Sequence, residues 1–268
     1  MDTAAYLERI GVDPAVDAAG GLGREAVAAL QAAHVRTIPF ETLAVTGDPF
    51  GDRDGEGVRL DPADLYEKIV ERRRGGYCYE LNGLFGRLLD ELGVEHDYVA
   101  AVMLGEDGEA RPPANHLSNL VTFGGERYLV DVGLGTPTLR EPLPLDGSAV
   151  TDEAGVSWRV VGTERPDADG LTQYRCPDAE TWTDRYLFET TPRDLSYFAA
   201  TNDYLSTAPE SPFTDSPVVA RATERGHVKL GPTRFVRWVD GEATEHPVLG
   251  ADEWHDRLHE AFDIDYPR

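Results

Sequence analysis

Cys78 stands where a cysteine side chain could be activated as a nucleophile. It lies just before the apolar series Leu81–Leu92 of a predicted helix, and it follows three consecutive arginines, Arg72, Arg73 and Arg74. A thiolate at a helix N-terminus is stabilised by the helix dipole and by free N–H groups, and nearby arginines add positive potential. A lone cysteine is more often a small buried apolar residue. A catalytic role for Cys78 therefore requires a base.

His116 and Asp131 can supply that base and its support. They lie on two apolar segments joined by Gly124 and Gly125, a pattern typical of a two-residue β-hairpin turn. In that hairpin Asp131 faces Ser118, and His116 is its diagonal neighbour on the same face, about 7 Å away. A four-residue loop would also keep both on one face, whereas a three-residue loop would separate them. Each residue alone fits an ordinary strand end or turn, but a carboxylate inside an apolar strand needs a partner.

Together, Cys78, His116 and Asp131 form the arrangement of an activated nucleophile. The histidine takes the thiol proton, and the aspartate fixes the tautomer and orientation of the imidazole. The chemistry of this triad is acyl transfer through a thioester. The residues leave open whether water, an amine or a thiol accepts the acyl group.

The charge of the chain limits its partners. The 268 residues contain 25 Lys plus Arg against 49 Asp plus Glu, a formal net charge of −24. This field repels phosphate and excludes a general nucleic-acid binder. Only Lys68 and Lys229 are lysines. An acidic chain with almost no lysine suggests a halophile's cytoplasm, where salt screens self-repulsion; the alternative is an ordinary acidic soluble protein.

Composition predicts a folded cytoplasmic protein. Hydrophobic residues make up 41% of the chain and aromatic residues 9%, enough for a buried core. No segment approaches the roughly 20 apolar residues that span a bilayer, and Met1–Ile10 carries no cationic apolar leader. Cys78 and Cys176 are the only cysteines, so we expect neither a disulfide framework nor a thiolate metal cluster, as in a reducing compartment.

The spacing of apolar residues predicts helices first, short strands next and a mixed end, which is an α+β protein. Helices are expected near residues 6–10, from 27 to Pro39, from Asp61 as N-cap and Pro62 as N1 to 70, over 81–92 with Gly93 as cap, and over 252–262. Strands are expected over 98–104, 116–123, 127–132, 157–161 and 186–189, in an antiparallel sheet or small barrel, with two more over 218–239 around Gly231 and Pro232. Residues 47–57 and 209–217 are expected to be loops. The expected units are 1–93, 94–195 and 196–268.

Five segments, in the expected order, resemble the sequence motifs of the arylamine N-acetyltransferases. They are His34–Leu43 with Ile38, Pro39, Phe40 and Glu41; Arg74–Asn82 around Cys78; His116 with Leu117; Asp131–Gly133; and Asn202, Tyr204, Ser206 and Ser211–Phe213. Each short motif alone is weak, but five in order argue against chance. The resemblance covers most of the chain.

This resemblance implies a fold and a reaction. The fold would be an N-terminal helical bundle, a β-barrel-like middle domain and a C-terminal α/β lid, with a cysteine-protease-like Cys-His-Asp site. The reaction would be ping-pong transfer of acetyl from acetyl-CoA to Cys78 and then to an arylamine or hydrazine. No permanently bound cofactor or metal is implied, and the oligomeric state is left open.

The resemblance also implies roles for neighbouring residues. Arg74 would pair with Glu41, and Asn82 would support the aspartate. The acceptor pocket would include Phe40, Gly133 and Leu134. Two positions depart from the family pattern: Thr42 stands where the family usually has Asn, and Leu134 stands where many members have Phe. The second departure removes an aromatic wall from the acceptor pocket.

Coenzyme A is itself an anion, so an acidic protein needs a local basic site to bind it. Residues 218–239 carry five basic residues against Glu224 alone, a local charge of +4 that leaves −28 elsewhere. The five are Arg221, Arg225, Lys229, Arg234 and Arg237. We expect this strip to supply part of the coenzyme phosphate site; the alternative is a solvated strand pair. High salt should screen the repulsion, so activity should rise with ionic strength before binding weakens.

Other features of the sequence are weaker. His255 and His259 have the spacing of a metal site on one helix face, but the acids around them indicate a solvated face. Cys176 sits in a turn and is taken as incidental. Oxyanion donors are expected among backbone N–H groups at the head of the Cys78 helix. The alternatives are an amide synthase or another acyltransferase of the family, a thiol hydrolase with the same triad, and a non-catalytic binding protein, which would be expected to lack a triad member.

Overall fold

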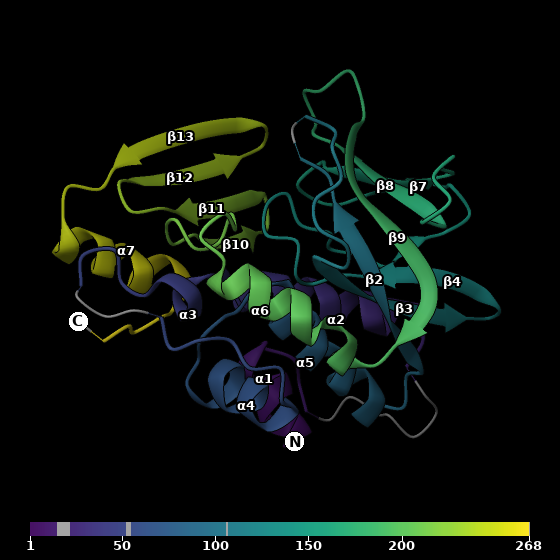
Figure 1. Ribbon diagram of the computed structural model, residues 1–268, viewed down its shortest axis with the longest axis horizontal. Coiled ribbons are helices and arrows are strands. Elements are labelled where there is room, and N and C mark those ends of the chain that lie inside the picture. The colour runs from purple at the N-terminus through teal and green to yellow at the C-terminus, as the bar shows by residue number, and fades with distance from the viewer. Residues whose placement is uncertain (15–21, 52–54, 106, 268) are drawn as a thin grey trace.

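The computed structural model describes residues 1–14, 22–51, 55–105 and 107–267. The helices are α1 (Thr3–Arg9), α2 (Arg24–Thr37), α3 (Leu43–Thr46), α4 (Pro62–Tyr66), α5 (Cys78–Glu91), α6 (Ala199–Thr207) and α7 (Ala251–Phe262), with a π-helical segment η1 (Glu67–Glu71) and a 3-10 segment η2 (Leu195–Phe198). In Figure 1, α1, α2, α4 and α5 lie together at the bottom of the view, beneath two sheets. No helix in the described ranges is long and apolar enough to cross a membrane.

The strands of the described residues form two sheets. The larger one has the order β5-β4-β3-β2-β9-β8-β7-β6, and the smaller one β1-β10-β11-β12-β13. The larger contains β2 (His96–Met103), β3 (His116–Phe123), β4 (Glu126–Val130), β5 (Leu143–Pro144), β6 (Val150–Thr151), β7 (Ser157–Val161), β8 (Gly170–Arg175) and β9 (Thr183–Arg193). The smaller contains β1 (Phe40–Glu41), β10 (Val219–Thr223), β11 (Gly226–Leu230), β12 (Arg234–Val239) and β13 (Glu242–Pro247). These helices and sheets confirm the α+β class.

Helix α5 is the central helix of the fold, as its sequence predicts. The side chains that repeat with helical spacing are all buried: Leu81, Leu84, Phe85, Leu88 and Leu89 are 0% exposed and Leu92 is 3% exposed. Gly93 follows with φ +73° and ends the helix. The apolar stripe packs against α1, α2 and η1 and against residues of β3 and β4. The first residue of this helix is therefore held from several sides.

The larger sheet curls so that β5 near one end lies against β7 near the other, which gives a nearly closed barrel. The β3–β4 hairpin has the predicted two-residue turn, with Phe123 opposite Glu126. Gly124 and Gly125 have φ +61° and +88°, values that glycine adopts without steric cost. The short strands β5 and β6 and the longer β8 were not expected from the sequence.

The smaller sheet corrects the prediction for 218–239. That segment forms three strands, β10, β11 and β12, because Glu224 and Arg225 make a second tight turn between β10 and β11. A further turn at Asp240 and Gly241 adds β13, which lies beside β12 at the upper left of Figure 1. Helix α7, predicted as a closing helix, packs on this sheet.

The loop at 209–217 is confirmed, and so is the non-helical backbone after Thr46, although 52–54 of the predicted loop 47–57 lie outside the described residues. Asp61 caps α4 by accepting from the Ala63 N–H, and Pro62 is its first residue, as predicted. The three units at 1–93, 94–195 and 196–268 remain a prediction. Strand β1 pairs with β10, so the first segment contributes an edge to the last sheet.

Candidate active site

Cys78 is the first residue of α5, and its side chain is 3% exposed. Its Sγ lies 3.8 Å from the carbonyl oxygen of Asn115. The chain at Gly133 passes so close that a Cβ there would lie 2.7 Å from the Cα of Cys78. Only glycine fits that approach. The fold thus brings the segment after β4 directly against the predicted nucleophile.

The β3–β4 hairpin brings His116 and Asp131 together. The Nε2 atom of His116 lies 2.6 Å from Oδ2 of Asp131, and both side chains are buried. The predicted register explains this contact. Asn119 pairs with Val130, so Asp131, the next residue along the chain, lies near the start of β3, where His116 stands. With Nε2 occupied, Nδ1 is the ring nitrogen left for the thiol of Cys78.

Both carboxylate oxygens of Asp131 are held. Its Oδ1 accepts from Nδ2 of Asn82 at 2.9 Å and from the N–H of Gly133 at 2.9 Å. The Oδ1 of Asn82 accepts in turn from the N–H of Val132 at 2.9 Å. Asn82 is four residues after Cys78, so one face of α5 carries both the thiol and the support of the carboxylate.

The electrostatics of the pair favour a charged imidazole. Burial lowers the pKa of His116, but the Asp131 carboxylate and the hydrogen-bonded sulfur of Cys78 outweigh it and raise that pKa to about 10. Burial raises the pKa of Asp131, while His116, Asn82 and the Gly133 N–H together bring it below its ordinary value. The arrangement can therefore draw the proton of the Cys78 thiol onto His116 at neutral pH.

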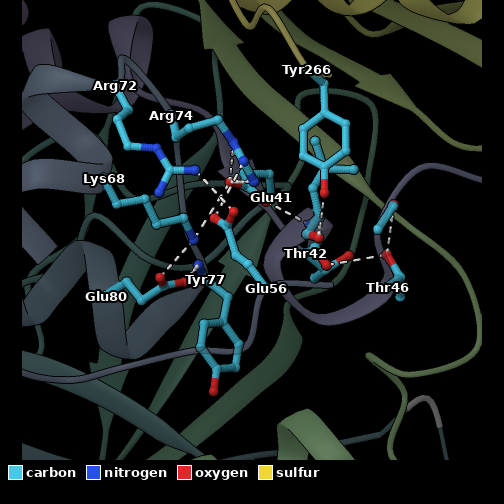
Figure 2. Close-up of polar contacts among 12 residues, drawn as sticks. Glu41, Thr42, Thr46, Glu56, Lys68, Arg72, Arg74, Tyr77, Glu80 and Tyr266 are labelled. Carbon is cyan, nitrogen blue, oxygen red and sulfur yellow. Dashed lines mark hydrogen bonds and ion pairs between the residues drawn. The ribbon is translucent and has the colours of Figure 1, made fainter. Parts of the chain in front are cut away.

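Figure 2 shows the pairing of Arg74 with Glu41, which the resemblance implied. Nη2 and Nε of Arg74 donate to Oε1 of Glu41 at 2.8 and 3.1 Å. Oε2 of Glu41 accepts from the N–H of Leu43 at 2.6 Å. The ring of Tyr266 lies 4.7 Å from the guanidinium carbon, so the chain's last described residues cover this pair. The pair holds the segment before Cys78 against β1.

The residues expected in the acceptor pocket occupy different surroundings. Phe40 is partly buried, and its ring lies 6.4 Å from that of Phe213. Gly133 lies against Cys78, as described above. Leu134 is 5% exposed and packs into the core of the large sheet. The two residues that depart from the family pattern, Thr42 and Leu134, both accept hydrogen bonds. The carbonyl of Leu134 accepts from Arg185 at 2.9 Å, and the hydroxyl of Thr42 accepts from the N–H of Val218 at 3.0 Å.

The segment from α6 to Phe213 covers the residue before the nucleophile. Oδ1 of Asn202 accepts from the hydroxyl of Tyr77, and the Phe213 ring lies 5.5 Å from the Tyr77 ring. The Ser206 hydroxyl donates to the carbonyl of Asn202 at 2.8 Å, within α6. The motif therefore contacts Tyr77, the residue directly before Cys78.

The five basic residues of 218–239 do not form one strip. Arg221 and Arg237 both pair across with Val228, so they share the face on which α7 packs. The period of two puts Lys229 and Arg234 on the opposite face. Arg234 binds Glu245 at 3.2 Å, and Arg225 in the turn binds Asp240. Arg221, Arg225 and Arg237 line a cavity of about 430 Å³ together with Glu224 and Glu260.

His255 and His259 also differ from the sequence expectation. His255 is 9% exposed, not on a solvated face, because its Nε2 bonds Asp48 at 2.8 Å. His259 is exposed and bonds Asp265 at 2.8 Å. The two imidazoles thus contact different carboxylates, and the part of the chain that the structure describes holds no group of side chains suited to a metal ion.

Several residues near the site were not singled out in the sequence. Ala114 has φ +55°, and its carbonyl accepts from the hydroxyl of Tyr79 at 2.6 Å just before His116. The ring of Tyr186 lies 5.2 Å from that of His116. Lys68 and Glu80 form a buried ion pair at 2.6 Å beside α5. Two features of the sequence could have pointed to this ion pair: lysine is rare in the chain, and Glu80 lies three residues after Tyr77, as in a helix capping box.

Comparisons with known proteins identify similar sequences and folds. A family model described as N-acetyltransferase matches residues 25–268. The arylamine N-acetyltransferase of Mycolicibacterium smegmatis is 37% identical over 92% of this chain and 85% of its own length. The proansamycin X synthase of Amycolatopsis mediterranei is 32% identical over 95% of this chain and 94% of its own. The solved structure of the arylamine N-acetyltransferase from Mycobacterium abscessus has TM-score 0.87 and 27% identity, and covers 100% of this chain and 91% of that one.

Proposed function

The chain belongs to the arylamine N-acetyltransferase family and is an acyltransferase, and from that premise we propose that Cys78 carries the acetyl group as a thioester. The observation that carries this proposal is the contact of His116 with both Asp131 and the buried thiol. The donor is acetyl-CoA and the acceptor an arylamine or hydrazine. The enzyme works by a ping-pong sequence with no permanently bound cofactor.

In the first half-reaction, His116 takes the proton of the Cys78 thiol through Nδ1. The sulfur attacks the carbonyl carbon of acetyl-CoA, and the bond from that carbon to the coenzyme sulfur breaks. His116 returns its proton to the departing coenzyme thiolate. Asp131 holds the imidazolium that forms between these two transfers.

In the second half-reaction, the acceptor nitrogen attacks the thioester carbonyl. His116 takes a proton from that nitrogen, the bond from carbon to the Cys78 sulfur breaks, and His116 passes the proton to the sulfur, which restores the thiol. The first N–H groups of a helix have no partner inside the helix, so those of Cys78 and Tyr79 are suited to stabilise the oxyanion in both steps. Phe40 and Gly133 border the acceptor, and the Leu134 side chain next to them is buried in the core of the large sheet and is smaller than an aromatic residue.

The test of this proposal is intact-mass analysis after incubation with acetyl-CoA. The protein is expected to gain one acetyl group and to lose it, with coenzyme release, when an arylamine or hydrazine is added. The matched pair is Cys78→Ala, which should gain none, and Cys176→Ala, which should behave as wild type. Absence of an adduct on the wild type would contradict the proposal. Turnover without amine would indicate a thiol hydrolase instead.

A second candidate is an amide synthase of the same family with another acyl donor. Its support is the 32% identity to a proansamycin X synthase and the leucine at position 134. Under this alternative, acetyl-CoA would acylate Cys78 slowly while a different activated acyl group would load rapidly.

The free cysteine and the coenzyme fit a cytoplasmic setting, and the acidic surface fits a cytoplasm rich in salt.

The coenzyme phosphates are assigned to the cavity under α7 rather than to all five basic residues. We predict that Arg221→Glu combined with Arg237→Glu raises the KM for acetyl-CoA roughly tenfold or more, because each charged hydrogen bond contributes about 1.5–3 kcal/mol. Steady-state kinetics at low salt would measure the change. Arg234→Glu, on the other face and already bound to Glu245, is the comparison variant and should have the smaller effect. Equal effects of the two variants would contradict the assignment.

A further inference from the structure

Lys68 stands out because lysine is so rare in this chain. It is one of two lysines beside 23 arginines, and it is only 7% exposed. Its Nζ lies 2.6 Å from Oε1 of Glu80 and 3.6 Å from Oε1 of Glu41. An ammonium group is a compact point charge, and it fits between two carboxylates where a planar guanidinium would need more room.

Figure 2 shows Lys68 between the carboxylates of Glu41 and Glu80, and Arg74 bound to Glu41. We call Glu41, Lys68, Arg74 and Glu80 the buried quartet; its members are 1%, 7%, 3% and 1% exposed. Two negative and two positive groups make the quartet neutral. Removing either cation would leave an uncompensated charge in the interior, which is costly.

Glu80 links the buried quartet to the nucleophile. It is the third residue of α5, two after Cys78, and its Oε2 accepts from the N–H of Tyr77 at 3.1 Å. Its other oxygen is the one held by Lys68. A Cβ on Gly76 would lie 2.8 Å from the Glu80 side chain, so the chain leading to Cys78 lies directly on this carboxylate. Lys68 thereby fixes the cap that sets where α5 begins.

The backbone of Lys68 also contacts the segment that leads to Cys78. Lys68 lies in η1, where the N–H of Arg72 bonds the carbonyl of Glu67 at 2.8 Å with the wider π-helical spacing. The carbonyl of Lys68 accepts from the N–H of Arg74 at 3.0 Å. One residue thus holds Glu80 through its side chain and Arg74 through its backbone. Such π-helical turns are frequent at functional sites.

Charge gives Lys68 a second effect on Cys78. A carboxylate at the head of α5 opposes a thiolate there, and a neighbouring ammonium group cancels that opposition. Burial raises the pKa of both neighbouring phenols, Tyr77 and Tyr79, so they stay neutral. Among the described residues, the Glu80–Lys68 ion pair thus lies at the head of α5, two residues from Cys78.

We propose that Lys68 is a positioning residue for the reaction: it holds Glu80 in the helix cap and cancels its charge, so that α5 presents Cys78 with positive potential. The inference rests on the proposed function, because it concerns the same nucleophile. Its test uses alkylation of Cys78, which needs no acetyl transfer. Failure of the inference and failure of the proposed function are therefore distinguishable.

The experiment is the pH profile of Cys78 alkylation by iodoacetamide, followed by peptide-resolved mass spectrometry. Lys68→Met is expected to raise the pH midpoint by about one unit, which is a roughly tenfold loss of rate below the midpoint. Glu80→Gln removes the negative charge but keeps an oxygen for the Tyr77 N–H, so it should lower the midpoint. The double variant should return it close to the wild-type value.

The control variant is Arg59→Met, which removes an exposed cation from the same side of the protein, 3.8 Å from Asp64. It should leave the midpoint unchanged. Thermal unfolding is measured in parallel, because a purely structural Lys68 would lower Tm without moving the midpoint, and that result would overturn the proposal. If Lys68→Met does not fold, Glu80→Gln decides alone: a midpoint that stays or rises would overturn it.

Discussion

Replacing Asp131 with Asn should lower kcat for acetyl transfer by about 10⁴-fold, the size of effect seen when an aspartate that orients a catalytic histidine is replaced in this way. The reason is the set of donors around the carboxylate. Oδ1 accepts from Asn82 and from the Gly133 N–H, both at 2.9 Å. An amide NH₂ group cannot take that place, so it must occupy the position of Oδ2.

At that position the new amide would donate to Nε2 of His116. Nε2 would then have to accept, and the ring proton would move to Nδ1, which faces the thiol. An imidazole protonated there cannot take the proton of Cys78. The variant should therefore fold normally but react slowly at every step that needs proton transfer.

The measurements are single-turnover acetylation and steady-state kcat. Asp48→Asn is the matched control, because Asp48 belongs to another buried His–Asp pair, with His255 at 2.8 Å. Its kcat should stay within a few-fold of wild type even if its Tm falls. A loss of less than tenfold for Asp131→Asn would contradict the role assigned to this carboxylate.

Replacing Arg74 with Met should lower the free energy of unfolding by about 3–5 kcal/mol, because it leaves the buried Glu41 without its main partner. Glu41 is 1% exposed and binds two nitrogens of Arg74. Lys68, 3.6 Å away, compensates only in part. Urea titration at neutral pH would measure the loss.

Two comparison variants identify the cause. Arg72→Met removes a neighbouring arginine whose side chain is 47% exposed and bound to Glu56, and it should cost at most about 1 kcal/mol. Arg74→Met combined with Glu41→Gln removes the stranded charge and should recover part of the stability. Failure of the double variant to recover any would contradict the charge argument.

The same pair predicts a pH dependence. Burial raises the pKa of Glu41, but the lowering effect of Arg74 and Lys68 is larger. The pKa therefore falls from its ordinary value of 4.5 to about 2. A carboxyl with a depressed pKa in the folded state stabilises the fold above its unfolded pKa, and the contribution is lost as the pH falls. The wild type should lose this contribution between pH 4.5 and 2, whereas in Arg74→Met the stranded Glu41 carboxylate should take up a proton as the pH falls, so that the variant's stability deficit relative to wild type shrinks at acid pH.

Local patterns predicted much of the scaffold. The apolar spacing of 81–92 fixed helix α5 because a helix repeats every 3.6 residues and one face must be buried. The Gly124–Gly125 turn fixed the register of β3 and β4 because two-residue turns require glycine-like backbone angles. Weak or two-residue strands such as β5 and β6 carry too little pattern to be recognised.

The basic residues of 218–239 show the limit of such patterns. Their charge was plain in the sequence, but their distribution over two faces depended on the turn at Glu224 and Arg225. A shift of one residue moves every side chain of a strand to the other face. His255 is a similar case, since Asp48 lies 207 residues away along the chain.

The sequence by itself determined that Cys78 begins a buried helix and that His116 and Asp131 share one face of a hairpin, because both depend on residues close together in the chain. The tertiary structure decided the partners of each charge: Asn82 for Asp131, Arg74 for Glu41 and Lys68 for Glu80. Buried charges are stable only beside a partner, and that partner is chosen by how the segments pack.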